Sequence, residues 1–285
     1  FSEIITNENE EIKKILLHQF LNGSTVSEVC SKEVKQLPPK QSHYFRNIES
    51  YMLQWGGMPS LLNLNDIRRW EWLKSYNLTY LERDLEDLAR LYDLKPFRIF
   101  HHLTALRSAQ LLSFSEIARD SGLSIETVRR YIEYLKISYQ VFLLPPFYKN
   151  LTSTVVKTPK IYWSDIGLWR QMTGVKEGVT GEIYENHVIA EIMKYIRSLG
   201  IDTRLFFYRT RSGMEIDLFL QTSSGMIGCE IKSREKIVQS DYSSLIKIAR
   251  TLGDEWLGGI IVYRGDKISE LAENIWAVPS YRLLS

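Results

Sequence analysis

Three charged residues interrupt two short apolar runs in the last third of the chain. Asp217 stands inside MEIDLFL, and Glu230 and Lys232 stand inside IGCEIKS. If both runs are strands, Asp217 lies on one face, and Glu230 and Lys232 share a face of the next strand. The short QTSSG segment between the runs is typical of a hairpin turn, which fixes the strand register. A carboxylate in an apolar run is costly unless it is paired or used, so these positions are the first candidates for a site.

The carboxylates suit a hard divalent cation. Mg²⁺ binds oxygen ligands, usually one or two carboxylates together with waters and phosphate oxygens. Adjacent strands lie about 5 Å apart, so Asp217 and Glu230 can reach one ion, and we expect them to hold Mg²⁺ or Mn²⁺. Glu185, on the helix before the strands, is expected to add an oxygen ligand. Lys232 is expected to orient the attacking water and offset negative charge at the scissile phosphate.

A second interpretation of these charges needs no catalysis. Charged residues two apart on a strand also form ion pairs on a solvated face. The same two alternatives hold for Arg209 and Arg211, just before the hairpin. They are candidates for binding a backbone phosphate through bidentate hydrogen bonds, or else belong to a solvated loop that partly neutralises the acidic site.

The elements that must position these residues follow from residue 180 onward. Periodicity and turn residues predict, in order, a helix, three strands, a helix, a strand and a short last strand. Their ranges are 181–199, 204–208, 214–221, 225–232, 239–252, 258–264 and a few residues near Trp276. Without the short last strand, the predicted order is αβββαβ.

The middle of the chain predicts a helix pair. SFSEIARDSGLSIETVRRYIEYLKISYQVFLL divides into a short helix over 114–120, a tight turn at Gly122 and a second helix over 124–139 that Ser124 can cap. The segments QVFLLPPF and TPKIYWSDIG read as two strands, which are candidates for a wing. Asp165 in the second segment is expected to cap the helix that follows it.

The second helix of this pair carries charges of both signs on its polar positions. Arg129 and Arg130 are its best candidates for contacting DNA. Glutamates on the same helix make it only a partial match to a phosphate-tracking surface. A module that packs against other protein is the alternative.

Residues before this pair predict almost only helix, over 10–21, 43–54, 66–78, 80–92 and 96–110. We therefore divide the chain into a helical subdomain (1–95), a winged helix (96–178) and a C-terminal αβββαβ domain (179–285). At 285 residues, with 44% hydrophobic residues, the chain is long enough for such a multidomain α+β protein.

Composition narrows the class of protein. No run of about eighteen apolar residues is present to span a bilayer, and Cys30 and Cys229 lack the spacing of a disulfide framework or a zinc site. We expect a cytoplasmic protein that does not enter a membrane. The net charge of +2 does not by itself indicate nucleic-acid binding, so any basic surface must be local.

Several segments together resemble a known family. They are GGMPS, YLERDLEDLARLYD, the helix pair, KIYWSDIGL, GEIYENHVIAEI, FFYRTRSGMEIDLFL and CEIKS, which resemble the C-terminal region of a prokaryotic family of AAA+ ATPases. In that family a P-loop ATPase precedes a helical lid, a winged helix and a nuclease-like domain. The chain begins at Phe1 and contains no GxxxxGK[ST], so we expect ATP binding only in a longer protein.

The resemblance also assigns chemistry. The D-x12-E-x-K spacing with αβββαβ order resembles the PD-(D/E)xK nucleases, whose restriction-endonuclease-like fold implies metal-dependent phosphodiester hydrolysis. Asp217, Glu230 and Lys232 fall on the catalytic positions, and Glu185 on the helix carboxylate.

Three functional hypotheses remain. The first is a DNA-engaging nuclease domain of an AAA+ protein. The second is a non-catalytic module that binds DNA or protein, or self-associates, on the same fold. The third is a regulatory half of an ATPase that does little alone.

Overall fold

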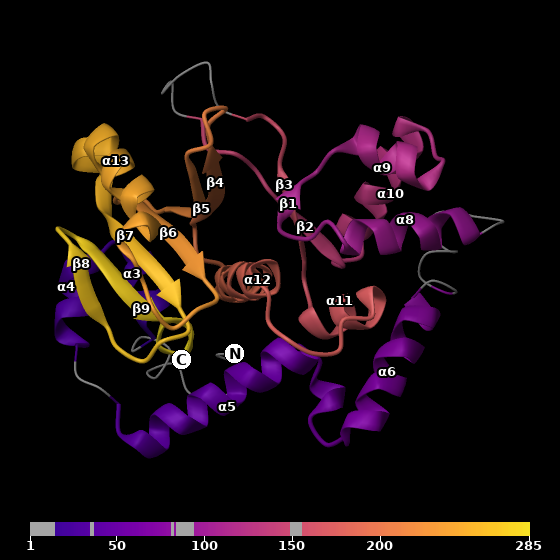
Figure 1. The fold of residues 1–285 in the computed structure, drawn as a ribbon, viewed down its shortest axis with the longest axis horizontal. Helices are drawn as coiled ribbons and strands as arrows, with labels where there is room; N and C mark the ends of the chain where they lie inside the picture. Colours follow the sequence, from indigo (N-terminus) through magenta and orange to yellow (C-terminus); the bar gives the residue numbers. More distant parts are fainter. Residues whose placement is uncertain (1–14, 35–36, 81–82, 84–93, 149–155) are drawn as a thin grey trace. The chain divides into compact units, whose positions relative to one another are not determined.

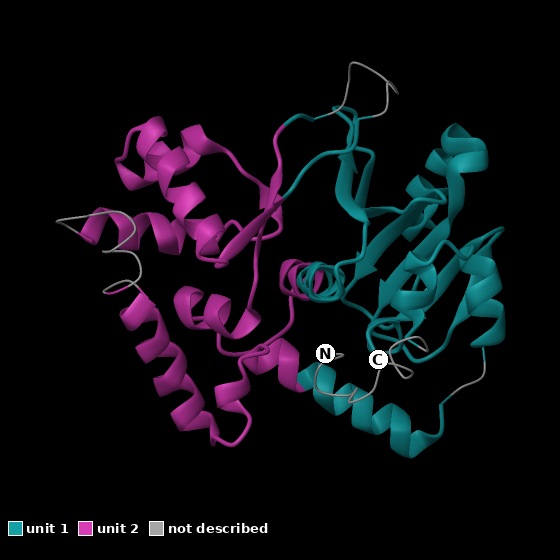
Figure 2. Ribbon diagram, turned by 180° about the vertical axis from the view of Figure 1, so that it is seen from behind, with its two compact units in different colours: residues 1–50, 144–157, 188–285 teal, residues 51–143, 158–187 magenta. Residues whose placement is uncertain are grey.

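The computed structural model describes residues 15–34, 37–80, 83, 94–148 and 156–285 (Figure 1). This described part is a mixed α+β protein with two β-sheets. By contacts the chain forms two compact units. Unit 1 contains residues 1–50, 144–157 and 188–285, and unit 2 contains residues 51–143 and 158–187 (Figure 2). The division into three consecutive domains stays a prediction.

Among the described residues, the sheet of unit 1 has six strands in the order β4-β5-β6-β7-β9-β8. Their bounds are β4 (Arg204–Arg209), β5 (Glu215–Gln221), β6 (Met226–Lys232), β7 (Trp256–Tyr263), β8 (Ser269–Ala272) and β9 (Ile275–Pro279). β4, β5 and β6 pair antiparallel, whereas β6, β7 and β9 run parallel to one another. β8 pairs antiparallel with β9 at the edge.

Helices cover both faces of this sheet. They are α3 (Leu16–Leu21), α4 (Val26–Lys32), α13 (Ser243–Leu252) and α14 (Ser280–Leu283), with the 3-10 turns η3 (Gln239–Asp241) and η4 (Gly253–Glu255) flanking α13. A side chain at Gly259 would meet Leu245 of α13, and one at Gly258 would meet Val26 of α4. Because successive strand residues point to opposite faces, α13 and α4 lie on opposite sides of the sheet. The apolar runs of β5, β6 and β7 are buried for this reason.

Unit 2 is mainly helical. Its helices are α6 (Asp66–Thr79), α8 (Lys95–Ala105), α9 (Phe114–Ser121), α10 (Ile125–Ile137) and α11 (Ile166–Thr173), with the 3-10 turn η1 (Pro59–Leu61). A small sheet in the order β1-β3-β2 joins β1 (Gln110–Leu111), β3 (Lys160–Trp163) and β2 (Val141–Leu144). Two long helices, α5 (Pro39–Trp55) and α12 (Gly181–Leu199), contribute residues to both units.

The predicted helix pair is present as α9 and α10. Gly122 ends α9 in the left-handed conformation at φ 70°, which costs glycine little. The Ser124 side chain then accepts a hydrogen bond from the Thr127 amide and caps α10, as expected. β2 and β3 lie where the two wing strands were predicted.

Asp165 caps a helix as predicted and makes one further contact. Its Oδ1 accepts from the Leu168 amide of α11 at 2.9 Å, and its Oδ2 accepts from the Gly57 amide at 2.8 Å. Gly56 adopts φ 77°, and a side chain there would collide with this carboxylate. The GGMPS and SDIG segments are therefore a structural junction of unit 2.

Some predicted bounds need correction. The helix predicted to run to residue 110 ends at Ala105, because Gln110 and Leu111 pair with β3. The helix predicted from residue 239 begins as the 3-10 turn η3, and α13 starts at Ser243. α4, β8 and α14 were not predicted. The helix expected over 80–92 and the start of that over 10–21 lie largely outside the described residues. None of the described helices is both long and apolar enough to cross a membrane.

Candidate active site

Asp217 and Glu230 lie opposite each other on neighbouring strands. The β5–β6 ladder ends at the pair Leu218–Cys229. One residue beyond it on each strand are Asp217 and Glu230, which both lie close to Lys232. Both side chains point to the face of the sheet that α13 covers. Asp217 lies two residues from Phe219 and Glu230 lies two residues from Gly228, and both of these face α13. They are buried, with exposed fractions of 8% and 6%. Asp217 and Glu230 therefore share one face of the sheet.

Lys232 completes the cluster. Its Nζ lies 2.6 Å from Glu230 Oε2 and 3.6 Å from Asp217 Oδ2. Asp217 Oδ2 also accepts a hydrogen bond from the Ile231 amide at 2.8 Å, which ties the start of β5 to the end of β6. The lysine side chain is 25% exposed and is the most accessible of the three. The site therefore opens to solvent on the side of Lys232.

Burial governs the protonation of the cluster. It raises the pKa of Glu230 to about 9, and the charge of Asp217 raises it further, whereas Lys232 acts in the opposite direction. Burial opposes the charge of Lys232, but Asp217 and Glu230 outweigh it and raise the pKa of the ammonium. When no other cation is bound, Glu230 therefore keeps its proton at neutral pH, and Lys232 keeps its positive charge.

Asp241 is a site residue that sequence reasoning missed. It lies in η3 just before α13, is 8% exposed, and its charge acts on Lys232. Its carboxylate accepts a hydrogen bond from the Val238 amide at 2.8 Å and forms an ion pair with Arg234. An acidic residue at a predicted helix start was the available signal, but it could equally have been read as an ordinary cap.

Arg209 and Arg211 lie at the turn between β4 and β5. Arg209 pairs with Glu215 across the ladder, with 3.4 Å between NH1 and Oε2, and its side chain is 41% exposed. Arg211 is exposed in the turn. Both arginines belong to the same unit as Asp217, and their contact with a phosphate stays a prediction.

Glu185 has different partners. Its Oε1 accepts from Tyr162 OH at 2.6 Å and lies 3.0 Å from Lys160 Nζ, both on β3. Lys160 is only 3% exposed. Glu185 belongs to unit 2 and Asp217 to unit 1, so neither unit alone brings them together. The metal-binding role of Glu185 stays a prediction.

Asn186, next to Glu185, was also missed. Its Oδ1 accepts from the Trp163 amide at 2.8 Å and from the Ser108 hydroxyl, and its Nδ2 donates to the Trp163 carbonyl at 2.9 Å. The carboxamide thus pairs with β3 as a neighbouring strand would. The start of α12 is fastened to β3 by both residues.

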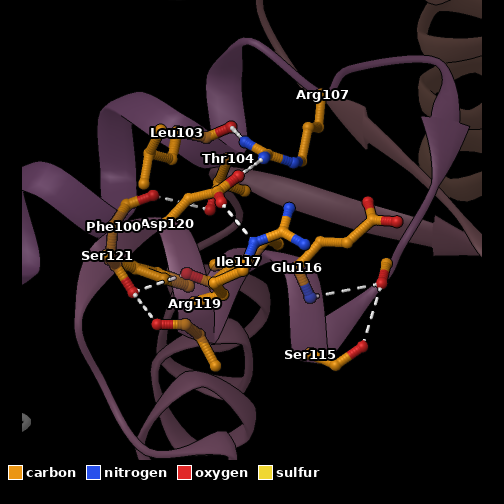
Figure 3. Close-up of polar contacts among 12 residues, drawn as sticks. Phe100, Leu103, Thr104, Arg107, Ser115, Glu116, Ile117, Arg119, Asp120 and Ser121 are labelled. Atoms are coloured by element: carbon orange, nitrogen blue, oxygen red, sulfur yellow. Dashed lines mark hydrogen bonds and ion pairs between the residues drawn. The ribbon is translucent and has the colours of Figure 1, made fainter.

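The two arginines proposed for DNA are exposed on α10. The Arg129 guanidinium lies 4.5 Å from the centre of the Phe114 ring, and that of Arg130 lies 5.9 Å from the Tyr131 ring. On α9, Asp120 forms ion pairs with Arg107 and Arg119 (Figure 3). The helix pair therefore presents cations, several of which are already held by rings or a carboxylate.

The chain was compared with known proteins. Residues 46–178 match a domain of unknown function (DUF8612), and residues 180–283 match a second domain of unknown function (DUF4143). The second is found in C-terminal regions associated with AAA ATPases.

Curated relatives match over most of the chain. Uncharacterized proteins of Mycobacterium bovis and Mycobacterium tuberculosis are each 28% identical over 276 residues, covering 93% of this chain and 57% of the relative. An uncharacterized protein of Methanocaldococcus jannaschii is 26% identical over 176 residues, covering 59% of this chain and 38% of the relative. The chain thus spans a little over half the length of the mycobacterial relatives. No solved structure matches it significantly.

Proposed function

We propose that unit 1 is a metal-dependent nuclease domain of the PD-(D/E)xK type, within the C-terminal part of an AAA+ ATPase-type protein that engages DNA. The observation that carries this proposal is the meeting of Asp217, Glu230 and Lys232 at one end of β5 and β6. Their D-x12-E-x-K spacing supports the same assignment. ATP binding would belong to residues outside this chain, which contains no GxxxxGK[ST].

The donor set fits Mg²⁺ or Mn²⁺. Asp217 and Glu230 are two buried carboxyl groups, and burial together with the charge of Asp217 keeps a proton on Glu230 at neutral pH. A divalent cation can replace that proton and balance both charges, with waters and phosphate oxygens completing its ligands. When bound, such an ion lowers the pKa of a ligand water and polarises the phosphoryl oxygen. Among the described residues no group of three or more acidic, histidine or cysteine side chains could hold a metal, so substrate oxygens are needed.

Each residue of this cluster would have a separate role in the reaction. Asp217 is held in place by the Ile231 amide and would hold the ion together with Glu230. Lys232 is the exposed member of the cluster, and its ammonium can bind the scissile phosphate and orient the attacking water. Asp241 keeps negative charge near Lys232 and favours its protonated form.

DNA engagement is proposed for two places. Arg209 and Arg211 lie on the same unit as the site and would hold a backbone phosphate. The helices α9 and α10 followed by β2 and β3 would form a winged helix whose Arg129 and Arg130 contact the backbone. Arg129→Ala and Arg130→Ala should weaken DNA binding evenly across sequences and lower its salt dependence.

Cleavage of plasmid DNA with and without Mg²⁺ or Mn²⁺ tests the nuclease. We expect metal-dependent nicking that falls about a hundredfold or more in Asp217→Asn and Lys232→Met. Matched controls are Asp254→Asn and Lys236→Met, exposed residues of the same unit, which should cleave like the parent. Cleavage that survives both site variants would overturn the assignment.

One observation favours a second candidate function. Lys232 already contacts both carboxyl groups, so the cluster is internally paired and can stabilise the sheet without a metal. The domain would then be a non-catalytic module for binding DNA or protein, or for assembly. In that case titration calorimetry shows no Mg²⁺ binding at millimolar concentration, and Asp217→Asn leaves DNA binding and oligomeric state unchanged.

A further inference from the structure

Unit 2 contains a pocket that is lined by none of the candidate site residues discussed above. It has a volume of about 240 Å³ and lies between α6, α8 and α11. Its lining residues are Lys74, Asn77, Leu78, Arg98, His101, Gln171 and Met172. At about 30 Å³ for one water, this is room for about eight waters, which is the size of a small metabolite.

Two buried polar atoms in this lining have no hydrogen-bond partner among the described residues. They are Nε2 of His101 and Oδ1 of Asn77. The two side chains are 2% and 6% exposed. Buried polar atoms in folded proteins almost always have a partner, and one without a partner costs about 1–3 kcal/mol. Both side chains line the pocket, so polar groups that the described fold does not use lie at its inner wall.

The inner wall is rigid and neutral. The His101 ring packs against the rings of Phe97, Tyr80 and Trp163, with centroids 5.6, 5.9 and 5.0 Å away. Burial lowers the pKa of His101 to about 3, with a smaller effect of His102, so the imidazole is neutral at physiological pH. The Asn77 amide donates to Gln171 Oε1, which fixes the carboxamide. These groups suit a neutral hydroxyl group, whose hydrogen Asn77 Oδ1 can accept.

The rim has the opposite character. Lys74 and Arg98 are both exposed, and none of the described residues of the lining is a carboxylate. Two cations without an acidic neighbour in the lining attract an oxyanion, and an arginine can bind a carboxylate or a phosphate in bidentate fashion. The pocket thus combines a cationic rim with a neutral polar floor.

We infer that this pocket binds a small organic oxyanion that also carries a hydroxyl group. Its carboxylate or phosphate lies between Lys74 and Arg98, and its neutral polar group reaches Asn77 and His101. The inference is independent of the nuclease proposal, because all lining residues belong to unit 2.

Titrations of the whole chain test this site, observed through the ¹⁵N signals of its histidine rings. The probes are glycerol 3-phosphate, glycerate, inorganic phosphate and glycerol. We expect a saturable shift of the His101 signal with glycerol 3-phosphate or glycerate, and the stronger of the two identifies the anionic group. Inorganic phosphate should bind more weakly because it reaches only the rim, and glycerol should not bind.

Variants distinguish binding in this pocket from nonspecific attraction of anions to surface cations. Arg98→Ala and Lys74→Ala should each weaken binding at least tenfold, whereas Arg68→Ala, an exposed cation of α6 outside the pocket, should leave it unchanged. Asn77→Leu should remove the advantage of glycerol 3-phosphate over inorganic phosphate. If Asn77→Leu does not fold, Gln171→Ala, which removes the partner of the Asn77 amide, is tested in its place. The inference is wrong if neither organic oxyanion gives a saturable shift, or if Arg98→Ala binds like the parent.

Discussion

Two lysine–glutamate pairs in this protein have similar distances but different surroundings. Lys232 lies 2.6 Å from Glu230, and Lys160 lies 3.0 Å from Glu185. In the first pair burial raises the glutamate pKa to about 9, and the charge of a second carboxylate, Asp217, adds to that rise. In the second pair the glutamate also accepts from the Tyr162 hydroxyl. A short ion-pair distance therefore does not distinguish a reactive cluster from an ion pair that only holds two elements together.

Accessibility distinguishes them better. The Lys232 side chain is 25% exposed, whereas that of Lys160 is 4% exposed. An accessible lysine beside crowded carboxylates can meet a ligand, whereas a buried lysine joined to a carboxylate on another element holds that element in place. The contrast predicts opposite responses of the two clusters to mutation, pH and metal.

Removal of each lysine should give the largest difference. Lys160→Met leaves the Glu185 carboxylate without its lysine and should destabilise the chain by about 3–5 kcal/mol. Lys232→Met should cost less, because Glu230 already keeps a proton at neutral pH. Urea unfolding measures both, with the exposed Lys157→Met as control. Equal losses would show that the two pairs are alike.

A second test concerns the hydrogen bonds by which Asn186 holds the start of α12 against β3. Asn186→Ala strips the Trp163 amide and carbonyl of their partners, so we expect a loss of about 2–3 kcal/mol. The exposed Asn63→Ala should change the unfolding free energy by less than about 0.5 kcal/mol. A loss as small as that of the control would mean that water replaces the Asn186 contacts.

The pH dependence should identify the crowded cluster. A carboxyl group whose folded pKa is raised to about 9 stabilises the fold fully below its unfolded pKa of 4.5, and this contribution is lost as pH rises towards 9. Glu230→Gln should therefore stabilise the chain by about 1–3 kcal/mol at pH 8 and by much less at pH 5, without divalent metal. Unfolding midpoints at the two pH values measure this. A gain that does not depend on pH contradicts the assigned protonation.

Divalent metal should have the smallest effect. Mg²⁺ at ten times its dissociation constant should stabilise the parent by about 1.4 kcal/mol, because it binds the folded state. Asp217→Asn should abolish that gain, and Asp254→Asn should keep it. Thermal unfolding with and without Mg²⁺ gives the comparison. A gain retained in Asp217→Asn would place the metal elsewhere.

Local pattern predicted much of the C-terminal fold. Alternating apolar residues gave β5 and β6 nearly their observed bounds, and the hairpin spacing placed Asp217 opposite Glu230. The caps at Ser124 and Asp165 followed from residue type alone. β8 was missed because SELA has little apolar alternation, and it forms by pairing with β9.

The sequence by itself determined which residues share a strand face and where helices start, because both depend on backbone geometry over a few residues. Only the tertiary structure decided the partners of those residues. Glu185 meets Lys160 and Tyr162, and Asp241 comes near Lys232, because packing brings distant segments together. Spacing cannot specify such contacts, since the burial of each group depends on the whole core that surrounds it.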